Sequence, residues 1–229
     1  MPADMVGFDG DGDGELRERF ETVARLFRAH GMEAQSYEAW WRSLADVLAE
    51  HPAERDLWIF AYGSLMWNPG IEVAERRTAR LRGFQRSFCL RDPAGRGSRD
   101  RPGLMLAIEP GTECRGIGFR IEARQLRSEL CTLWTREMVG RGYVAQWVQL
   151  ESEAGPMRAI AFVVNRAGER YAGGLSADAT AAVLARARGL LGSGREYLDS
   201  TAAQLAALGI RDETIDTLCE RVRAIGEQG

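Results

Sequence analysis

Residues 57–65 read Leu-Trp-Ile-Phe-Ala-Tyr-Gly-Ser-Leu, and the fold prediction starts from this stretch. Its first five residues form an apolar run without a charge, which predicts a buried β-strand over 57–61. Tyr62, Gly63 and Ser64 then supply the residue types of a tight loop. A strand that turns sharply at a glycine leaves backbone N–H groups unpaired, and such a nest binds carboxylates or oxyanions. On spacing alone, the residues favour the alternative, a plain turn in the core.

After this strand, the chain is predicted to form mostly strands first and mostly helices later. Further strands are predicted over residues 80–90, 103–108, 116–121, 144–150 and 157–164, with a long Gly-, Pro- and Arg-rich loop over 91–102. Helices are predicted over residues 123–138, 176–191, 195–208 and 211–225. Strands gathered early and helices gathered late predict an α+β fold and not a doubly wound α/β fold.

The chain before the strand predicts a tail over residues 1–14 and a helical hairpin. Helical spacing over 16–30 stops at Gly31, and a second helix runs from an N-cap at Ser36 to Glu50. Two helices alone bury too little surface, so we expect the hairpin to pack on the main domain. The domain prediction is therefore an extension over 1–56 and a main domain over 57–229.

Composition narrows the function classes. The formal net charge is −3, which does not indicate the basic surface that a nucleic-acid partner requires. No apolar stretch approaches the roughly 20 residues of a membrane-spanning helix, and the N-terminus has no apolar region of a secretory signal. We therefore expect a cytoplasmic protein with no membrane and no nucleic-acid partner.

Several absences bear on the chemistry. The chain has no lysine, which excludes Schiff-base catalysis, a lysine-anchored pyridoxal phosphate and a Walker-A lysine. Its two histidines, His30 and His51, precede the main domain, which disfavours a Ser-His or Cys-His machine unless the N-terminal segment supplies one. The four cysteines are scattered, and the Asp-Gly repeat over 9–14 breaks off where a calcium loop needs a glutamate. No metal and no cofactor are expected.

Glu137 is the carboxylate that attracts attention. At 100° per residue it lands near the centre of the apolar face formed by Leu126, Leu130, Leu133 and Trp134. A carboxylate seldom lies on an apolar face without a purpose or a partner. Desolvation there would raise its pKa and make it a base near neutral pH. The alternative is a structural residue that ends the helix and pairs with an arginine such as Arg141, whereas Arg136 is expected to be solvated.

Two further features are open to either interpretation. Tyr197 falls in the first turn of a late helix, where its hydroxyl would reach a cleft or its ring would pack in a core. Arg96, in the long loop, would hold an anionic substrate or remain solvated.

Together, these segments resemble the ChaC-like gamma-glutamylcyclotransferases over residues 57 to about 218. The motifs that carry the resemblance occur in family order: Tyr62-Gly63-Ser64-Leu65 with Trp67, Gly83-Phe84-Gln85-Arg86-Ser87-Phe88, Arg96-Gly97 leading to Arg101-Pro102-Gly103, Gly116-Ile117-Gly118-Phe119-Arg120, Arg136-Glu137 with Gly142-Tyr143, Tyr171-Ala172-Gly173, and Glu196-Tyr197-Leu198. The resemblance implies a small mixed β-barrel with flanking helices, to which the N-terminal hairpin is added.

The resemblance also implies roles. The catalytic residue would be Glu137, the substrate loop Tyr62, Gly63, Ser64 and Leu65, the rim arginine Arg96, and the pocket tyrosines Tyr143 and Tyr197. Two positions depart from the family pattern. Ala61 replaces the first glycine of Phe-Gly-Tyr-Gly-Ser-Leu, and Arg141 replaces the first glycine of Gly-Gly-Tyr, which bears on the turn before Tyr143.

The implied reaction is the conversion of glutathione to 5-oxoproline and cysteinylglycine. The substrate's α-amino group attacks its own γ-carbonyl, and one glutamate moves the protons, so no enzyme nucleophile, metal or cofactor is needed. Three alternatives remain: a cyclotransferase acting on other gamma-glutamyl amides or dipeptides, a non-catalytic ChaC-like regulatory binding protein, and a scaffolding role centred on the hairpin.

Overall fold

The structure is a computed structural model that describes residues 13–227, so the predicted tail over 1–14 lies almost wholly outside the described residues. The helices are α1 (Asp13–Ala29), α2 (Tyr37–Ala49), α3 (Leu126–Glu137), α4 (Ala177–Arg186), α5 (Gly194–Ala207) and α6 (Glu213–Glu227), with short 3₁₀ turns η1 (Ser64–Met66) and η2 (Ala123–Gln125). The strands are β1 (Leu57–Ala61), β2 (Glu75–Asp92), β3 (Gly103–Ile121), β4 (Tyr143–Glu151), β5 (Met157–Val164), β6 (Arg188–Gly189) and β7 (Gly192–Ser193).

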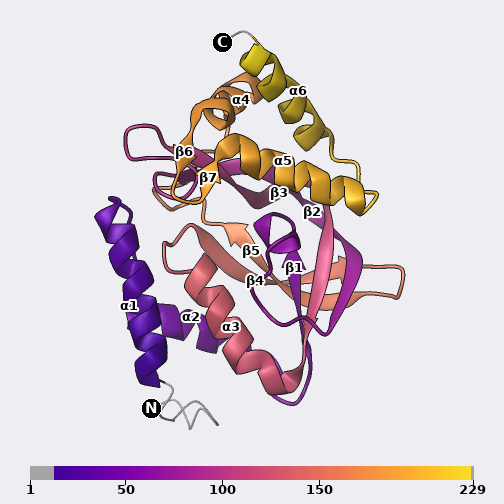
Figure 1. The fold of residues 1–229 in the computed structure, drawn as a ribbon. Coiled ribbons are helices and arrows are strands. Elements are labelled where there is room, and N and C mark those ends of the chain that lie inside the picture. The colour runs from indigo at the N-terminus through magenta and orange to yellow at the C-terminus, as the bar shows by residue number, and fades with distance from the viewer. Residues whose placement is uncertain (1–12, 228–229) are drawn as a thin grey trace.

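Five strands close into a barrel in the order β1-β3-β2-β4-β5. β1 pairs antiparallel with β3 and parallel with β5, so the barrel is mixed. Figure 1 shows α3 along one side of it and α4, α5 and α6 together at one end. The prediction of an α+β fold with a small mixed barrel and flanking helices is confirmed.

β1 is buried on both of its faces, as its apolar sequence predicts. Successive side chains of a strand point to opposite faces. Ile59 and Ala61 accordingly join a core cluster with Trp134 of α3, whereas Phe60 joins a second cluster with Ile108. Because β1 is packed on both faces, the position of the Tyr62–Leu65 loop that follows it is also fixed.

The predicted strand over 80–90 begins earlier, at Glu75, and two other predicted elements are wrong. Residues 103–121 form one strand instead of two, because β2 pairs with β3 along almost its full length, with register shifts between Arg82 and Phe84 and between Ser87 and Leu90. The predicted helix over 176–191 ends at Arg186, because Ala187 takes extended backbone angles and the chain enters the β6–β7 hairpin at Arg188.

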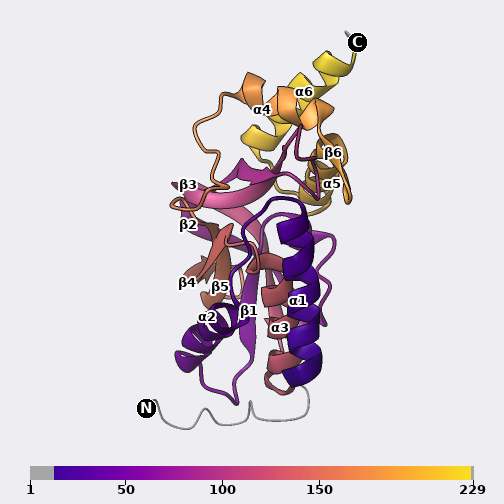
Figure 2. The same ribbon diagram turned by 90° about the vertical axis from the view of Figure 1, so that its left-hand side faces the viewer.

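The N-terminal hairpin is present, and both of its helices pack on α3 (Figures 1 and 2). Ser36 caps α2 as predicted, its hydroxyl accepting from the Ala39 N–H at 3.2 Å. The ring centroids of Phe20 in α1 and Trp40 in α2 lie 5.3 Å apart. The hairpin is therefore part of the same hydrophobic core as α3.

Within residues 13–227, no helix is long and apolar enough to cross a membrane.

Candidate active site

A small cavity lies where the loop after β1 meets the ends of several other elements. Its lining consists of Tyr62, Gly63, Ser64, Leu65, Leu106, Glu137, Tyr143, Phe162 and Tyr197. All of the residues singled out from the sequence except Arg96 are thus brought together. The cavity encloses about 20 Å³, little more than one ordered water needs.

Glu137 is the carboxylate of this cavity. It is the last residue of α3, and its side chain is only 10% exposed. Burial raises its pKa, while the positive charges of Arg136 and Arg170 oppose that rise. A carboxyl group with a raised pKa accepts and returns a proton nearer to neutral pH.

Arg136 differs from the solvated residue predicted from the sequence. Its Nε lies 3.0 Å from Glu137 Oε1, and its Nη2 donates to Ser64 Oγ at 3.0 Å. Its Nη1 donates a further hydrogen bond to the Asn68 carbonyl at 2.6 Å. Arg136 therefore ties Glu137 to the loop after β1. The alternative pairing of Glu137 with Arg141 does not occur, since Arg141 pairs with Glu33 at 2.7 Å.

Three tyrosine hydroxyls approach the cavity. Tyr143 donates to the Leu106 carbonyl at 2.8 Å, and Tyr62 donates to the Phe162 carbonyl. Burial is the main reason that the pKa of Tyr197 rises to about 12, with the negative charge of Glu137 adding to it. The pKa values of Tyr62 and Tyr143 are also raised, first by burial. All three hydroxyls therefore stay protonated and remain donors at neutral pH.

The Tyr62–Leu65 loop reaches the cavity through its backbone. Within the described residues, the N–H groups of Gly63 and Leu65 donate no hydrogen bond. A Cβ on Gly63 would lie 3.2 Å from the Tyr197 hydroxyl and 3.5 Å from Leu106 Cβ, so a glycine keeps the cavity open at this point. The loop thus offers free donors beside the carboxylate.

Arg86 holds the same loop from behind. Its side chain is 1% exposed, and it donates to the Tyr62 carbonyl at 2.6 Å and to the Arg115 carbonyl at 2.5 Å. Its third contact is an ion pair with Asp212 at the start of α6. Because a trans peptide places its N–H opposite its C=O, anchoring the Tyr62 carbonyl directs the Gly63 N–H away from Arg86.

Arg96 lies behind Tyr197 and not in the cavity lining. Its guanidinium carbon is 5.2 Å from the centre of the Tyr197 ring. The ring centroids of Trp67 and Phe88 lie 5.4 Å and 5.8 Å from the Tyr197 ring centroid, in T-shaped arrangements. Arg96 therefore helps to hold Tyr197 in place.

Sequence reasoning gave no site role to Arg136, Arg170, Leu106 or Phe162. Arg170 donates from Nε to the Arg91 carbonyl at 2.9 Å, and its charge acts on both Glu137 and Tyr143. The signal for the two arginines was their position, since Arg136 is part of a family motif and Arg170 precedes the one that begins at Tyr171. Leu106 and Phe162 gave no such signal, because they read as ordinary strand residues.

The model of ChaC-like proteins matches residues 57–225. The chain belongs to the ChaC-like family. The glutathione-specific gamma-glutamylcyclotransferase of Escherichia coli (strain K12) is 40% identical over 184 residues, which cover 80% of each chain. Glutathione-specific gamma-glutamylcyclotransferase 1 of Homo sapiens is 31% identical over 173 residues, or 72% of this chain and 78% of the human one.

A solved structure shares the ChaC-like fold. A yeast gamma-glutamyl cyclotransferase specific to glutathione superposes with a TM-score of 0.69 at 21% identity. The match covers 74% of this ChaC-like chain and 96% of the yeast one.

Proposed function

We propose that this ChaC-like protein is a glutathione-specific gamma-glutamylcyclotransferase that converts glutathione to 5-oxoproline and cysteinylglycine. The observation that carries the proposal is Glu137, the one carboxylate in the lining of the cavity, beside a loop whose backbone N–H groups at Gly63 and Leu65 are free within the described residues. The relatives in Escherichia coli and Homo sapiens that bear this name support the choice of substrate.

The substrate supplies its own nucleophile. The α-amino nitrogen of the gamma-glutamyl group forms a bond to the γ-carbonyl carbon and closes a five-membered ring. The bond from that carbon to the cysteine nitrogen then breaks. Well-oriented intramolecular reactions reach effective molarities of about 10⁵ M or more, so holding the substrate folded supplies much of the rate.

Glu137 would move the protons. It takes a proton from the substrate ammonium, which makes the nitrogen nucleophilic, and it later gives a proton to the departing cysteine nitrogen. Its raised pKa suits both steps, because a very acidic carboxyl group would be a weak base. Arg136 holds the carboxylate through the 3.0 Å contact and keeps it from becoming neutral too readily.

The other site residues would bind and orient. The N–H groups of Gly63 and Leu65 would donate to the substrate carboxylate or to the developing oxyanion. The hydroxyls of Tyr143 and Tyr197 would border the gamma-glutamyl group, with Arg96 acting through the Tyr197 ring. Because the cavity encloses about 20 Å³, side chains must shift when a gamma-glutamyl group enters.

We also propose that the protein works in the cytoplasm. Cys89, Cys114 and Cys219 take part in no disulfide within the described residues. Free thiols are usual in the reducing compartments where disulfides are rare.

The experiment is product analysis by mass spectrometry with glutathione and gamma-glutamyl-alanine in parallel. We expect 5-oxoproline and cysteinylglycine from glutathione and little turnover of the dipeptide. Consumption of the dipeptide alone would retain the reaction and refute the substrate. If folded protein consumed neither compound, the catalytic proposal would be wrong and a binding role would take its place.

The pH dependence of kcat/KM should report Glu137. Because burial raises its pKa, the carboxylate that acts as base is lost at a higher pH than for an ordinary glutamate. We expect activity to fall as the pH is lowered through this raised pKa. Circular dichroism at each pH separates this loss from acid unfolding. An acidic limb at or below the ordinary glutamate pKa would contradict the assignment.

A further inference from the structure

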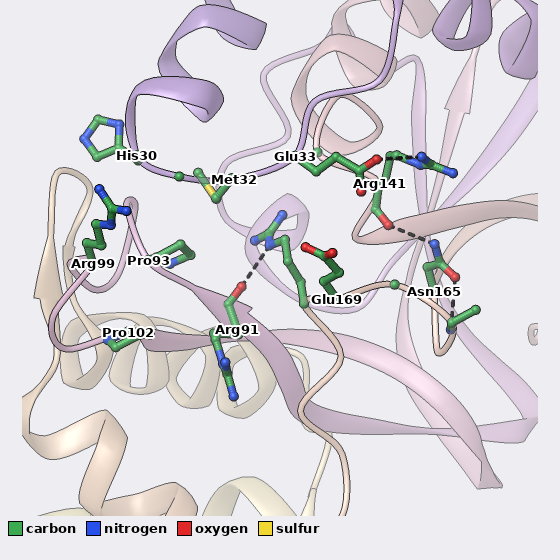
Figure 3. A pocket seen from close by; sticks show the side chains of 15 residues that line it. His30, Met32, Glu33, Arg91, Pro93, Arg99, Pro102, Arg141, Asn165 and Glu169 are labelled. Atoms are coloured by element: carbon green, nitrogen blue, oxygen red, sulfur yellow. Dashed lines mark hydrogen bonds and ion pairs between the residues drawn. The ribbon is translucent and has the colours of Figure 1, made fainter.

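The linker between α1 and α2, residues 30–36, crosses the loop that follows Glu137. Figure 3 shows Glu33 of this linker beside Arg141, above a groove of about 540 Å³ between the linker and the barrel loops. Residues 138–142 form that loop and lead from α3 into β4. The linker therefore lies against the segment that continues directly from the candidate base.

Gln35 makes the closest contacts with this segment. Its backbone N–H donates to the Val139 carbonyl at 3.0 Å, and its side-chain Nε2 donates to the Met138 carbonyl at 2.6 Å. The last carbonyls of an α-helix have no partner within the helix and need one from elsewhere. Gln35 supplies one such bond, to the C-cap residue Met138, and a second to Val139 just beyond the helix, so it caps the end of α3 from a distant part of the chain.

Arg141 adds a second tether. Its φ of +51° makes it the one residue other than glycine with a positive φ in the described part of the chain. Its side chain forms an ion pair with Glu33 at 2.7 Å, and its carbonyl accepts from Asn165 Nδ2 at 3.0 Å. The arginine at a position where the family pattern has glycine thus gains a contact to the linker that a glycine would lack.

Phe27 of α1 presses on the same loop. A Cβ on Gly140 would lie 1.9 Å from a Phe27 ring carbon, so the loop and the ring approach as closely as a glycine allows. The Arg170 guanidinium lies 5.8 Å from the centre of that ring. The hairpin thus contacts one of the two arginines whose charges act on Glu137.

We infer that the N-terminal hairpin positions the catalytic glutamate, with Gln35 as the principal positioning residue. The inference rests on the proposed function. Helix ends fray unless they are capped, and Glu137 is the final residue of α3. A displacement of about 1 Å in a catalytic group costs about 10²-fold in rate. The extension that precedes the matched family region therefore belongs to the catalytic machinery.

The test is Gln35→Met, which keeps the side-chain volume and removes the amide donor. We expect kcat for glutathione to fall about tenfold with KM within about twofold, as for an orienting residue. Looser packing admits water to Glu137, so the acidic limb of kcat/KM should move to lower pH. The matched control is Gln149→Met, because Gln149 is exposed on β4 and should leave kcat and the limb unchanged.

A structural role without positioning predicts another pattern. The melting temperature would then fall while kcat and the acidic limb of the folded enzyme stayed as in wild type, and this result would overturn the inference. If Gln35→Met does not fold, Gln35→Ala removes the same donor without filling the space.

A charge exchange gives an independent measurement at an exposed pair. Glu33→Arg places two guanidinium groups together and should lower kcat about threefold, whereas adding Arg141→Glu should restore it. The rate of backbone amide hydrogen exchange over residues 138–141 gives a measurement that does not depend on enzyme activity. If wild type does not cyclise glutathione, the proposed function fails, but Gln35→Met must still speed exchange in this segment. Unchanged exchange would refute the positioning role itself.

Discussion

Glu137→Gln is expected to lower kcat/KM for glutathione by about 10³-fold, within the range for removal of a general acid–base group. The amide has nearly the shape of the carboxyl group and still accepts from Arg136, but it neither takes a proton from the ammonium nor returns one. The measurement is the rate of 5-oxoproline release at several substrate concentrations. Near wild-type turnover would refute the acid–base assignment.

The matched control for this variant is Glu129→Gln on the same helix. Glu129 accepts from the Glu72 N–H at 3.0 Å and does not line the cavity. Its replacement should leave turnover unchanged.

Glu137→Gln should also leave the melting temperature at pH 7 unchanged or higher. The folded-state pKa of Glu137 is raised, so the folded protein holds this proton more tightly than the unfolded chain does. Its contribution to stability is present below the unfolded pKa and is lost as the pH rises through the folded pKa. A neutral amide has no such loss. Thermal unfolding at pH 7 measures it.

Arg86→Met is expected to have the largest effect on stability, about 3 kcal/mol of unfolding free energy, because breaking a buried pair leaves its partner uncompensated. Asp212 loses its ion pair, and the carbonyls of Tyr62 and Arg115 lose their donors. The melting temperature should fall by about 6–12 °C for a chain of this size. Urea unfolding gives the free energy directly.

The control is Arg124→Met, which removes an arginine that is 79% exposed and paired with Glu122. Exposed pairs contribute about 0–1 kcal/mol, so little change is expected. Equal losses in the two variants would mean that Arg86 is not the anchor that its contacts indicate. Should Arg86→Met be too unstable to purify, Asp212→Asn weakens the same pair and should show a smaller loss of the same sign.

Local sequence was sufficient for much of the fold. The apolar run over 57–61 and the Ser36 cap depend on neighbours in the chain, and the structure contains both where they were predicted. The position of Glu137 on an apolar helix face also follows from spacing alone, since 100° per residue fixes which side chains share a face. Its low exposure agrees with that reading. The catalytic and binding roles assigned to the site residues stay predictions.

Tertiary structure decided what those residues contact. Pairing with β2 joins two predicted strands into β3, and the sequence of residues 103–121 does not indicate that this pairing occurs. Arg136 turns toward Ser64 and Glu137 only because the loop after β1 lies there, whereas helical spacing placed it in solvent. Gln35 reaches the carbonyls after Glu137 across a separation of 103 residues. Periodicity carries information over a few turns of helix or strand, but the partners of a charged or polar side chain depend on how distant elements pack. The sequence by itself therefore determined the elements and the carboxylate, and packing determined its partners.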